Sequence, residues 1–147
     1  MHSFHLATET EIDCHSPFDE VTIPGSNITS PNYPNNYDNR KDCQTTIRFA
    51  VGQIVNITFE AFDVEHNSAC SWDYLKIYDG DTSTNSPIIG SKLCGIGTHV
   101  GTTIQSTGNA MTILFHTDSV VTKRGFKILA NVGKNYRIIN TSHLDTI

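Results

Sequence analysis

The chain has 147 residues, with 15 acidic residues against 10 Lys and Arg, and its formal net charge is −5. This balance argues against an electrostatic nucleic-acid binder, which needs a basic face, and no run approaches the roughly 20 apolar residues of a membrane span. The length fits one domain, and a hydrophobic fraction of 37% predicts a modest core.

Alternation of apolar and polar residues with a period of two predicts strands along most of the chain. In chain order, the alternating segments are 43–49, 54–61, 73–78, 111–116 and 125–130. The clearest is 54–61, whose expected inner face consists of Val55, Ile57, Phe59 and Ala61. Turn-forming clusters separate the segments, at 24–27, 31–36, 79–81 and 106–109.

Short strands joined by polar turns predict an all-β fold, a two-sheet antiparallel β-sandwich. No window shows the periodicity of an amphipathic helix of ordinary length. The segments at the two ends lack a pattern. We therefore expect an N-terminal extension at 1–13, one domain at 14–132, and a C-terminal tail or linker at 133–147.

Cysteines and sequons predict an extracellular, secreted glycoprotein. The four cysteines are widely spaced and contain no C-x-x-C pair, which favours two disulfides over a structural zinc site. Three N-x-[ST] sequons offer glycosylation sites at Asn27, Asn56 and Asn140. The first residues lack the basic start and apolar run of a signal peptide, so we interpret the chain as a mature form, a fragment or an expression product.

The motifs along the chain resemble those of a CUB domain, an extracellular β-sandwich module, over about residues 14–132. The resemblance rests on the four-cysteine frame and on the following blocks: Ser30-Pro31-Asn32-Tyr33-Pro34 with Tyr37, Trp72 to Gly80 (WDYLKIYDG), Leu93-Cys94-Gly95, and Gly125-Phe126. It implies a jelly-roll-like arrangement of the two sheets and the disulfides Cys14–Cys43 and Cys70–Cys94. The spacing of the cysteines alone leaves all three pairings open.

An acidic segment between residues 60 and 81 holds six acids against one base. A solvated acidic face is one interpretation of this segment, and oxygen ligands for a hard cation are the other. One branch of the CUB family binds calcium through three acids, and by resemblance these are Glu65, Asp73 and Asp118, with a backbone carbonyl near Val120. Tyr37 matches the tyrosine that steadies one of the acids. Three converging carboxylates without a cation would repel one another, and Ca²⁺ prefers six to eight oxygen ligands.

The resemblance also implies a function in protein–protein recognition, with Ca²⁺ as the cofactor. In the calcium-binding branch, the metal-fixed acids accept a Lys or Arg of an extracellular partner through charge-assisted hydrogen bonds. We expect Glu65, Asp73 and Asp118 to do so here, with His66, Asn67 and Ser119 at the rim. The affinity of one such contact is modest, so strong binding would require avidity from oligomers or from tandem modules in a multidomain chain.

Two other functions remain open at this point, and catalysis is not expected. The chain contains no G-x-S-x-G, H-E-x-x-H or Gly-rich phosphate loop, and its histidines lack metal-ligand spacing. The first alternative is a structural or matrix glycoprotein in which calcium only stiffens the fold. The second is a non-catalytic domain excised from a larger secreted protease.

Overall fold

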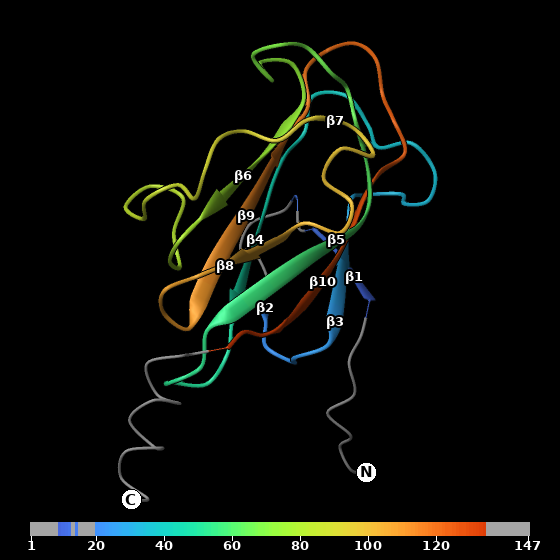
Figure 1. Ribbon diagram of the computed structural model, residues 1–147. Coiled ribbons are helices and arrows are strands. Elements are labelled where there is room, and N and C mark those ends of the chain that lie inside the picture. Colours follow the sequence, from blue (N-terminus) through green and yellow to red (C-terminus); the bar gives the residue numbers. More distant parts are fainter. Residues whose placement is uncertain (1–8, 13, 15–19, 135–147) are drawn as a thin grey trace, which may run out of the picture.

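The computed structural model describes residues 9–12, 14 and 20–134, and within them the chain forms two packed β-sheets. In chain order the strands are β1 (Glu9–Glu11), β2 (Glu20–Val21), β3 (Ser26–Thr29), β4 (Asp42–Arg48), β5 (Val55–Val64), β6 (Tyr74–Tyr78), β7 (Gly95–Ile96), β8 (Thr103–Gln105), β9 (Ala110–His116) and β10 (Gly125–Val132). One sheet has the order β1-β3-β10-β5-β7, with β8 on β5, and the other has the order β2-β4-β9-β6. The predicted all-β sandwich is confirmed (Figure 1).

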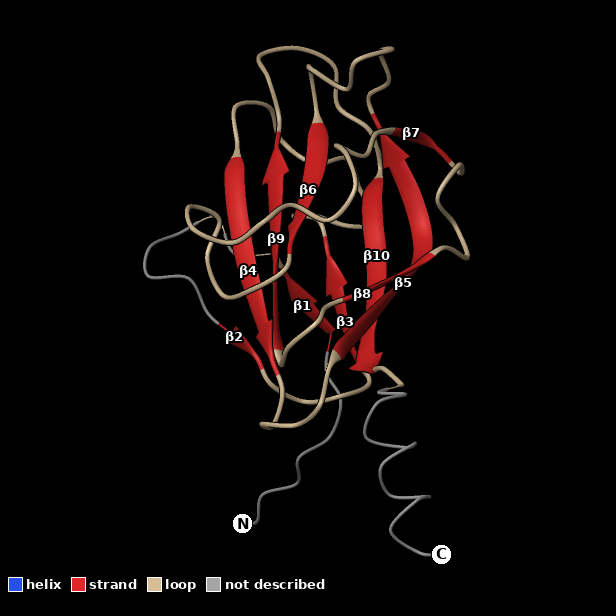
Figure 2. Cartoon of the chain, turned by 60° about the vertical axis from the view of Figure 1, so that its left-hand side comes forward, coloured by secondary structure: helices blue, strands red, loops and turns tan. Residues whose placement is uncertain are grey.

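The core lies between the sheets, and Figure 2 shows them side by side. The predicted alternation is confirmed on the long central strands. Met111, Ile113 and Phe115 of β9 are fully buried, as are Phe126 and Ile128 of β10. Ring edges meet across the core, with Phe115 and Phe126 centroids 5.1 Å apart and their planes almost perpendicular. Such aromatic pairs add packing energy beyond the burial of their area.

The predicted face of β5 is correct as far as Phe59 and wrong at Ala61. Lys127 and Ile128 of β10 pair with Ala61 and Phe59, so Glu60 is an extra residue on β5. This β-bulge shifts the alternation by one residue, which turns Ala61 outward beside Lys127. Phe62 and Val64 therefore enter the core in its place.

Two short strands near the beginning of the described chain pair in parallel, so both sheets are mixed. β1 runs parallel to β3, and β2 runs parallel to β4, whereas all other pairings among the described strands are antiparallel. Alternation within a strand fixes its inner face but carries no information about its direction relative to a neighbour. The added strands cover the outer sides of β3 and β4 and leave the central sandwich as expected.

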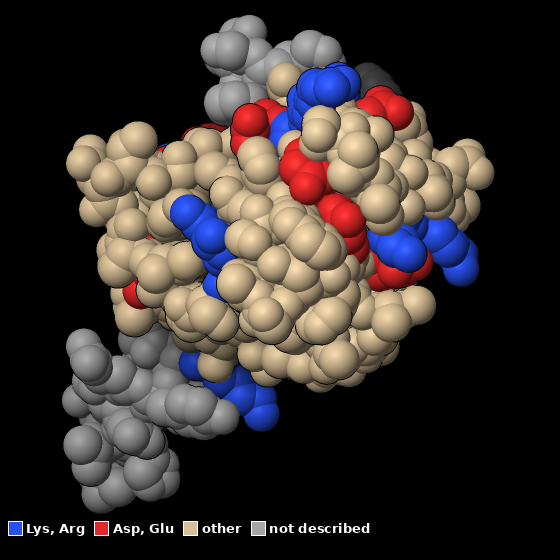
Figure 3. All heavy atoms as spheres, turned by 90° about the horizontal axis from the view of Figure 1, so that it is seen from above, with Lys and Arg blue, Asp and Glu red and all other residues tan. Residues whose placement is uncertain are grey.

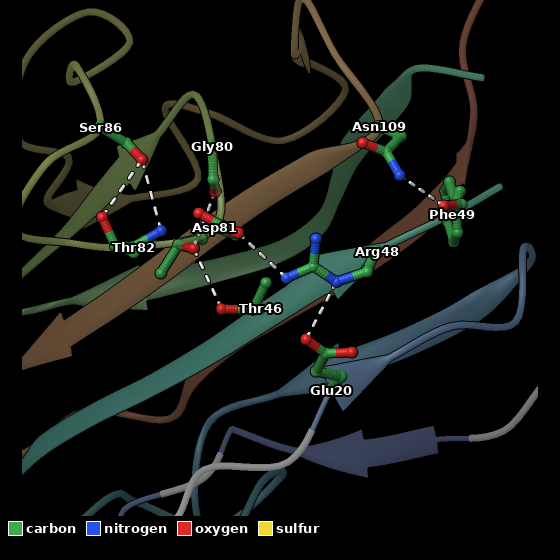
Figure 4. Close-up of polar contacts among 10 residues, drawn as sticks. Glu20, Thr46, Arg48, Phe49, Gly80, Asp81, Thr82, Ser86 and Asn109 are labelled. Carbon is green, nitrogen blue, oxygen red and sulfur yellow. Dashed lines mark hydrogen bonds and ion pairs between the residues drawn. The ribbon is translucent and has the colours of Figure 1, made fainter. Parts of the chain in front are cut away.

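Arg48 fastens the short strand β2 to the body of the domain (Figure 4). Its guanidinium lies between Glu20 of β2, at 3.1 Å, and Asp81 in the loop after β6, at 3.3 Å. These two acceptors raise the pKa of Arg48 further above its usual range. All three side chains are solvent-accessible, so the pairs position these segments and contribute little free energy each.

Two disulfides close the frame, with the pairing that the family resemblance implies. Cys14 is bonded to Cys43 at the start of β4, and Cys70 in the β5–β6 loop is bonded to Cys94 next to β7. The second bridge lies at the end of the sandwich where β5 and β9 finish and β6 and β10 begin, the upper end in Figure 2. No helix among the described residues is long and apolar enough to cross a membrane.

Candidate metal centre

The strand topology brings three acids together at this upper end of the sandwich. Glu65 directly follows β5, Asp73 directly precedes β6, and Asp118 lies two residues after β9. Each offers one carboxylate oxygen, and these three oxygens lie within 4.8 Å of one another. Oxygens bound to a single Ca²⁺ at 2.3–2.6 Å are at most about 5 Å apart, so the spacing suits one calcium ion.

Asp73 is the organising member of this acid cluster (Glu65, Asp73 and Asp118). Its side chain is fully buried. Its Oδ2 accepts a hydrogen bond from the hydroxyl of Tyr37 at 2.7 Å, and its Oδ1 accepts one from the backbone N–H of Asp118 at 2.8 Å. Burial raises the pKa of Asp73, while these two donors act in the opposite direction by favouring the charged form.

Tyr37 joins two of the three acids. Its hydroxyl donates to Asp73 and accepts the backbone N–H of Glu65 at 3.1 Å. The ring is buried and packs edge-on against Phe115, with centroids 5.0 Å apart. Burial raises the pKa of Tyr37 well above its usual value. The hydroxyl therefore stays neutral and remains a donor to the carboxylate.

Asp118 is positioned by its neighbour Thr117, which is buried in the loop after β9. The Thr117 hydroxyl donates to the carbonyl of Asp38 and accepts from the N–H of Lys41, each at 2.8 Å. The carbonyl of Asp118 accepts the N–H of Arg40 at 2.7 Å. These bonds fix the backbone of Asp118 and leave its carboxylate half-exposed at the mouth of the cluster.

Glu65 carries the observation that points to a ligand. Only 6% of this residue is exposed, and its buried Oε1 has no hydrogen-bond partner among the described residues. Burial and, after it, the nearby charges of Asp73 and Asp118 together raise the pKa of Glu65 to about 7. An unpaired buried carboxylate oxygen is costly. The residues present therefore fit a hard cation that would satisfy this oxygen and offset the repulsion.

The residues expected at the rim differ in whether their side chains are available to a partner. His66 and Ser119 are exposed. Asn67, in contrast, uses its side chain to close its own loop, accepting from the N–H of Ser71 and donating to its hydroxyl at 2.9 Å. Val120 is exposed, and its N–H donates to Asp118 Oδ1 at 3.3 Å.

The sequons lie away from the acid cluster, where they are described. Asn27 lies on β3 and Asn56 on β5, both half-buried. Asn56 pairs with Asn131 and Gln105 on the neighbouring strands. Asn140 lies outside the described residues, as do most of the two expected extensions.

Sequence reasoning missed a hollow beside the acids, with a volume of about 330 Å³. It is lined by Trp72, Ile96, Val121 and Lys123 together with Glu65 and His66. The position of Trp72 directly before Asp73 was a usable signal, but a tryptophan next to a strand more often packs inward. Figure 3 looks onto this end of the molecule and shows a row of acidic side chains with basic ones at both ends.

Comparison with known proteins agrees with this arrangement. A profile described as CUB domain matches residues 14–129. Tolloid-like protein 1 of Mus musculus is 38% identical over 121 residues, which are 81% of this chain and 12% of that protein. Cubilin of Rattus norvegicus is 39% identical over 108 residues, 73% of this chain and 3% of that protein. The chain thus spans only a small part of these relatives.

Solved structures show the same fold. The crystal structure of the MASP-1 CUB2 domain bound to Ca²⁺ has a TM-score of 0.65 at 30% identity, and the match covers 77% of this chain and 96% of that one. The full extracellular region of zebrafish Gpr126/Adgrg6 has a TM-score of 0.69 at 34% identity, with 84% and 15% covered. From its motifs, its sandwich and these matches, the chain belongs to the CUB domain family.

Proposed function

We propose that this chain is a non-catalytic, calcium-binding CUB module that recognises extracellular proteins. The single observation that carries the proposal is the buried Oε1 of Glu65, which has no partner in the described part of the chain and lies within a cluster of three carboxylates. The Ca²⁺ named for the MASP-1 CUB2 structure supports the choice of metal. Glu65, Asp73 and Asp118 would hold the ion, together with the carbonyl of Val120.

The recognition step follows from the charges that the ion leaves unbalanced. Three carboxylates exceed the charge of one Ca²⁺, so the occupied site keeps a negative charge at the half-exposed Asp118. A Lys or Arg of a partner can form a charge-assisted hydrogen bond there. The ion supplies preorganisation, because it holds the carboxylates in place before the partner arrives. His66 and Ser119 would lie at the rim of this contact.

We propose further that the module is one unit of a longer extracellular protein. The chain corresponds to 12% of Tolloid-like protein 1 and 3% of cubilin, and one solved relative is itself an extracellular region. Two disulfides fit an oxidising compartment. Tandem modules or oligomers would supply the avidity that a single basic contact lacks.

The test of the metal site is thermal unfolding in Ca²⁺ and in EDTA. A ligand at about 100 times its Kd stabilises a fold by about 2.7 kcal/mol, so we expect the Tm to rise by about 5–10 °C in Ca²⁺. Asp118→Asn should abolish the gain. Glu60→Gln is the matched control, since Glu60 is an exposed acid on the bulge of β5. Equal melting curves in Ca²⁺ and EDTA would contradict calcium binding.

A second measurement tests recognition of the basic side chain. Immobilised protein should bind a lysine-bearing partner peptide in Ca²⁺ and release it in EDTA, and replacing the lysine by norleucine should remove the binding. Calcium-dependent stabilisation without any such binding would favour the stiffening role, in which the ion only supports the fold.

A further inference from the structure

We propose that the hollow beside the acid cluster binds a bulky apolar side chain next to the basic residue of the partner, an inference that rests on the proposed function. The surface would then select a segment of a protein that carries Lys or Arg with an aromatic or branched aliphatic neighbour. The exposed apolar side chains at this end of the domain and the position of the hollow beside the acids carry this inference.

Apolar side chains are concentrated around the acids without being packed by the fold. Trp72 is 47% exposed, Ile96 is 73% exposed and Val121 is 48% exposed, and all three line the same hollow. They come from three different segments, since Trp72 lies two residues before β6, Ile96 ends β7 and Val121 lies in the β9–β10 loop. Convergent apolar exposure of this kind, bordered by charged groups, is typical of an interaction site.

The backbone of Val121 gives independent support. Its φ is +64°, in the left-handed region that β-branched residues rarely occupy. Glycine or asparagine would be less strained there, and the exposed side chain gains little from packing in the free domain. Fold stability therefore does not account for a valine at this position, whereas an apolar contact with a partner does.

The hollow and the acid cluster are adjacent and have one residue in common. This proximity indicates that the occupant carries an apolar group next to a basic one. Glu65 is both a member of the cluster and a lining residue, and Trp72 directly precedes Asp73. A basic group held at the cluster thus places its neighbouring side chain against Trp72 and Ile96. A cavity of about 150 Å³ holds a benzene-sized molecule, so about 330 Å³ is ample for one side chain.

The surface also continues past Ile96, which suits an extended segment rather than a single residue. A second hollow of about 190 Å³ lies along Ile96 and is lined by Tyr33, Phe62 and Arg124. Asp63, which pairs with Ile96 between β5 and β7, lines both hollows. The two adjoining hollows together present acidic, apolar and basic groups to a bound segment.

Trp72 is the only tryptophan of the chain, so its fluorescence reports directly on the hollow. Three capped peptides serve as probes in Ca²⁺: Gly-Gly-Lys-Gly-Gly, Gly-Phe-Lys-Phe-Gly, and Gly-Phe-Nle-Phe-Gly with norleucine. We expect Gly-Phe-Lys-Phe-Gly to bind about tenfold more tightly than Gly-Gly-Lys-Gly-Gly, because partial burial of an apolar side chain is worth about one factor of ten. Of the two peptides without norleucine, only Gly-Phe-Lys-Phe-Gly should shift the emission of Trp72 to the blue.

Two variants and one control test the location. Ile96→Ser and Val121→Gly should each remove the preference for phenylalanine while keeping weak binding of Gly-Gly-Lys-Gly-Gly. Val121→Gly also relieves the backbone strain, so a melting temperature at or above that of the wild type excludes unfolding as the cause. Ile88→Ser makes the same chemical change at an exposed position in the β6–β7 loop and should leave the preference intact.

The outcomes separate the two proposals. If both lysine peptides bind equally in Ca²⁺ and neither binds in EDTA, the hollow has no role and the proposed function stands. The inference is also overturned if Ile96→Ser keeps the preference. If Gly-Phe-Lys-Phe-Gly and Gly-Phe-Nle-Phe-Gly bind equally well, both in Ca²⁺ and in EDTA, the result supports binding in the hollow and contradicts the basic contact. No binding of any peptide overturns both.

Discussion

The environment of a single residue, Glu65, indicates that the site binds a ligand. A glutamate directly after a core strand would ordinarily turn to solvent, yet this one is buried, and one of its oxygens is unpaired within the residues that the structure describes. Burial and two neighbouring carboxylates raise its pKa to about 7 from a usual 4.5. Below about pH 7 the protonated form of Glu65 is therefore favoured in the metal-free domain, whereas a bound cation needs the charged form.

The first prediction concerns pH. Between about pH 4.5 and pH 7 the metal-free folded state holds a proton on Glu65 that the unfolded state has lost, so metal-free stability falls as pH rises. Calcium binds the deprotonated site, so the gain in Tm on adding Ca²⁺ should grow from near zero at about pH 5 to its maximum above about pH 7. Melting curves in Ca²⁺ and EDTA across this range measure it. Glu65→Gln should flatten the metal-free curve in this window, and a calcium gain that is independent of pH would contradict the prediction.

The second prediction concerns Tyr37, whose hydroxyl connects Asp73 to the backbone of Glu65. Tyr37→Phe keeps the buried ring and leaves two buried polar groups without a partner, which costs about 1–3 kcal/mol. We expect lower stability in denaturant unfolding and weaker Ca²⁺ affinity by calorimetry. Tyr33→Phe is the control, since this hydroxyl makes no hydrogen bond within the described chain. Wild-type calcium affinity in Tyr37→Phe would show that the hydroxyl does not position the acids.

At the scale of elements, the start of β10 illustrates why the Gly125-Phe126 motif has its form. Gly125 has a φ of +91°, and a Cβ there would overlap the hydroxyl of Ser30. That hydroxyl accepts the N–H of Phe126 at 3.0 Å and so attaches β10 to the loop after β3. Any side chain at Gly125 would displace Ser30 and break this bond.

Gly125→Ala is therefore our third prediction. It combines the strain of a positive φ, about 1–2 kcal/mol, with overpacking of about 1–3 kcal/mol. Gly52→Ala isolates the first cost, since Gly52 has a φ of +93° and open space around its Cβ. Denaturant unfolding should show the larger loss for Gly125→Ala. Equal losses in the two variants would mean that the contact with Ser30 relaxes freely.

The bulge on β5 shows where the alternation of apolar and polar residues no longer predicts which side chains face inward. The alternation of Val55, Ile57 and Phe59 is correct, but Glu60 adds a residue that no neighbouring turn signal announces. The shift places Phe62 and Val64 in the core, and Glu65 then follows at the end of the strand. An unshifted alternation instead places Ala61, Asp63 and Glu65 on the inner face, in place of Phe62 and Val64.

At the scale of the whole molecule, the two disulfides differ in what they connect. They close segments of similar length, with separations of 29 and 24 residues, so the entropic stabilisation is similar at about 3–4 kcal/mol each. Only Cys70–Cys94 joins the loop between Glu65 and Asp73 to β7, next to the hollow. Loss of Cys70–Cys94 should therefore weaken the metal site more than loss of Cys14–Cys43 does.

The fourth prediction compares the two bridges. Replacing Cys70 and Cys94 by serine should lower the Tm by several degrees and weaken Ca²⁺ affinity, because the acid-bearing loop loses its anchor. Replacing Cys14 and Cys43 should lower the Tm by a similar amount with calcium affinity close to that of the wild type. Calorimetry on both double variants measures the contrast, which fails if the two affinities fall equally.

The sequence by itself determined the all-β class, the inner faces of the long strands as far as the bulge on β5, and the CUB motifs, because alternation and turn chemistry are local properties of the chain. The parallel pairing of β1 and β2, the phase shift at Glu60 and the placement of Trp72 were decided only by the tertiary structure. The acid cluster stands between these cases. Family resemblance named Glu65, Asp73 and Asp118, but 53 residues separate the first from the last, and only the packing of β5, β6 and β9 brings their oxygens within 4.8 Å. The physical reason is that contacts between distant segments depend on strand register, which no single segment encodes.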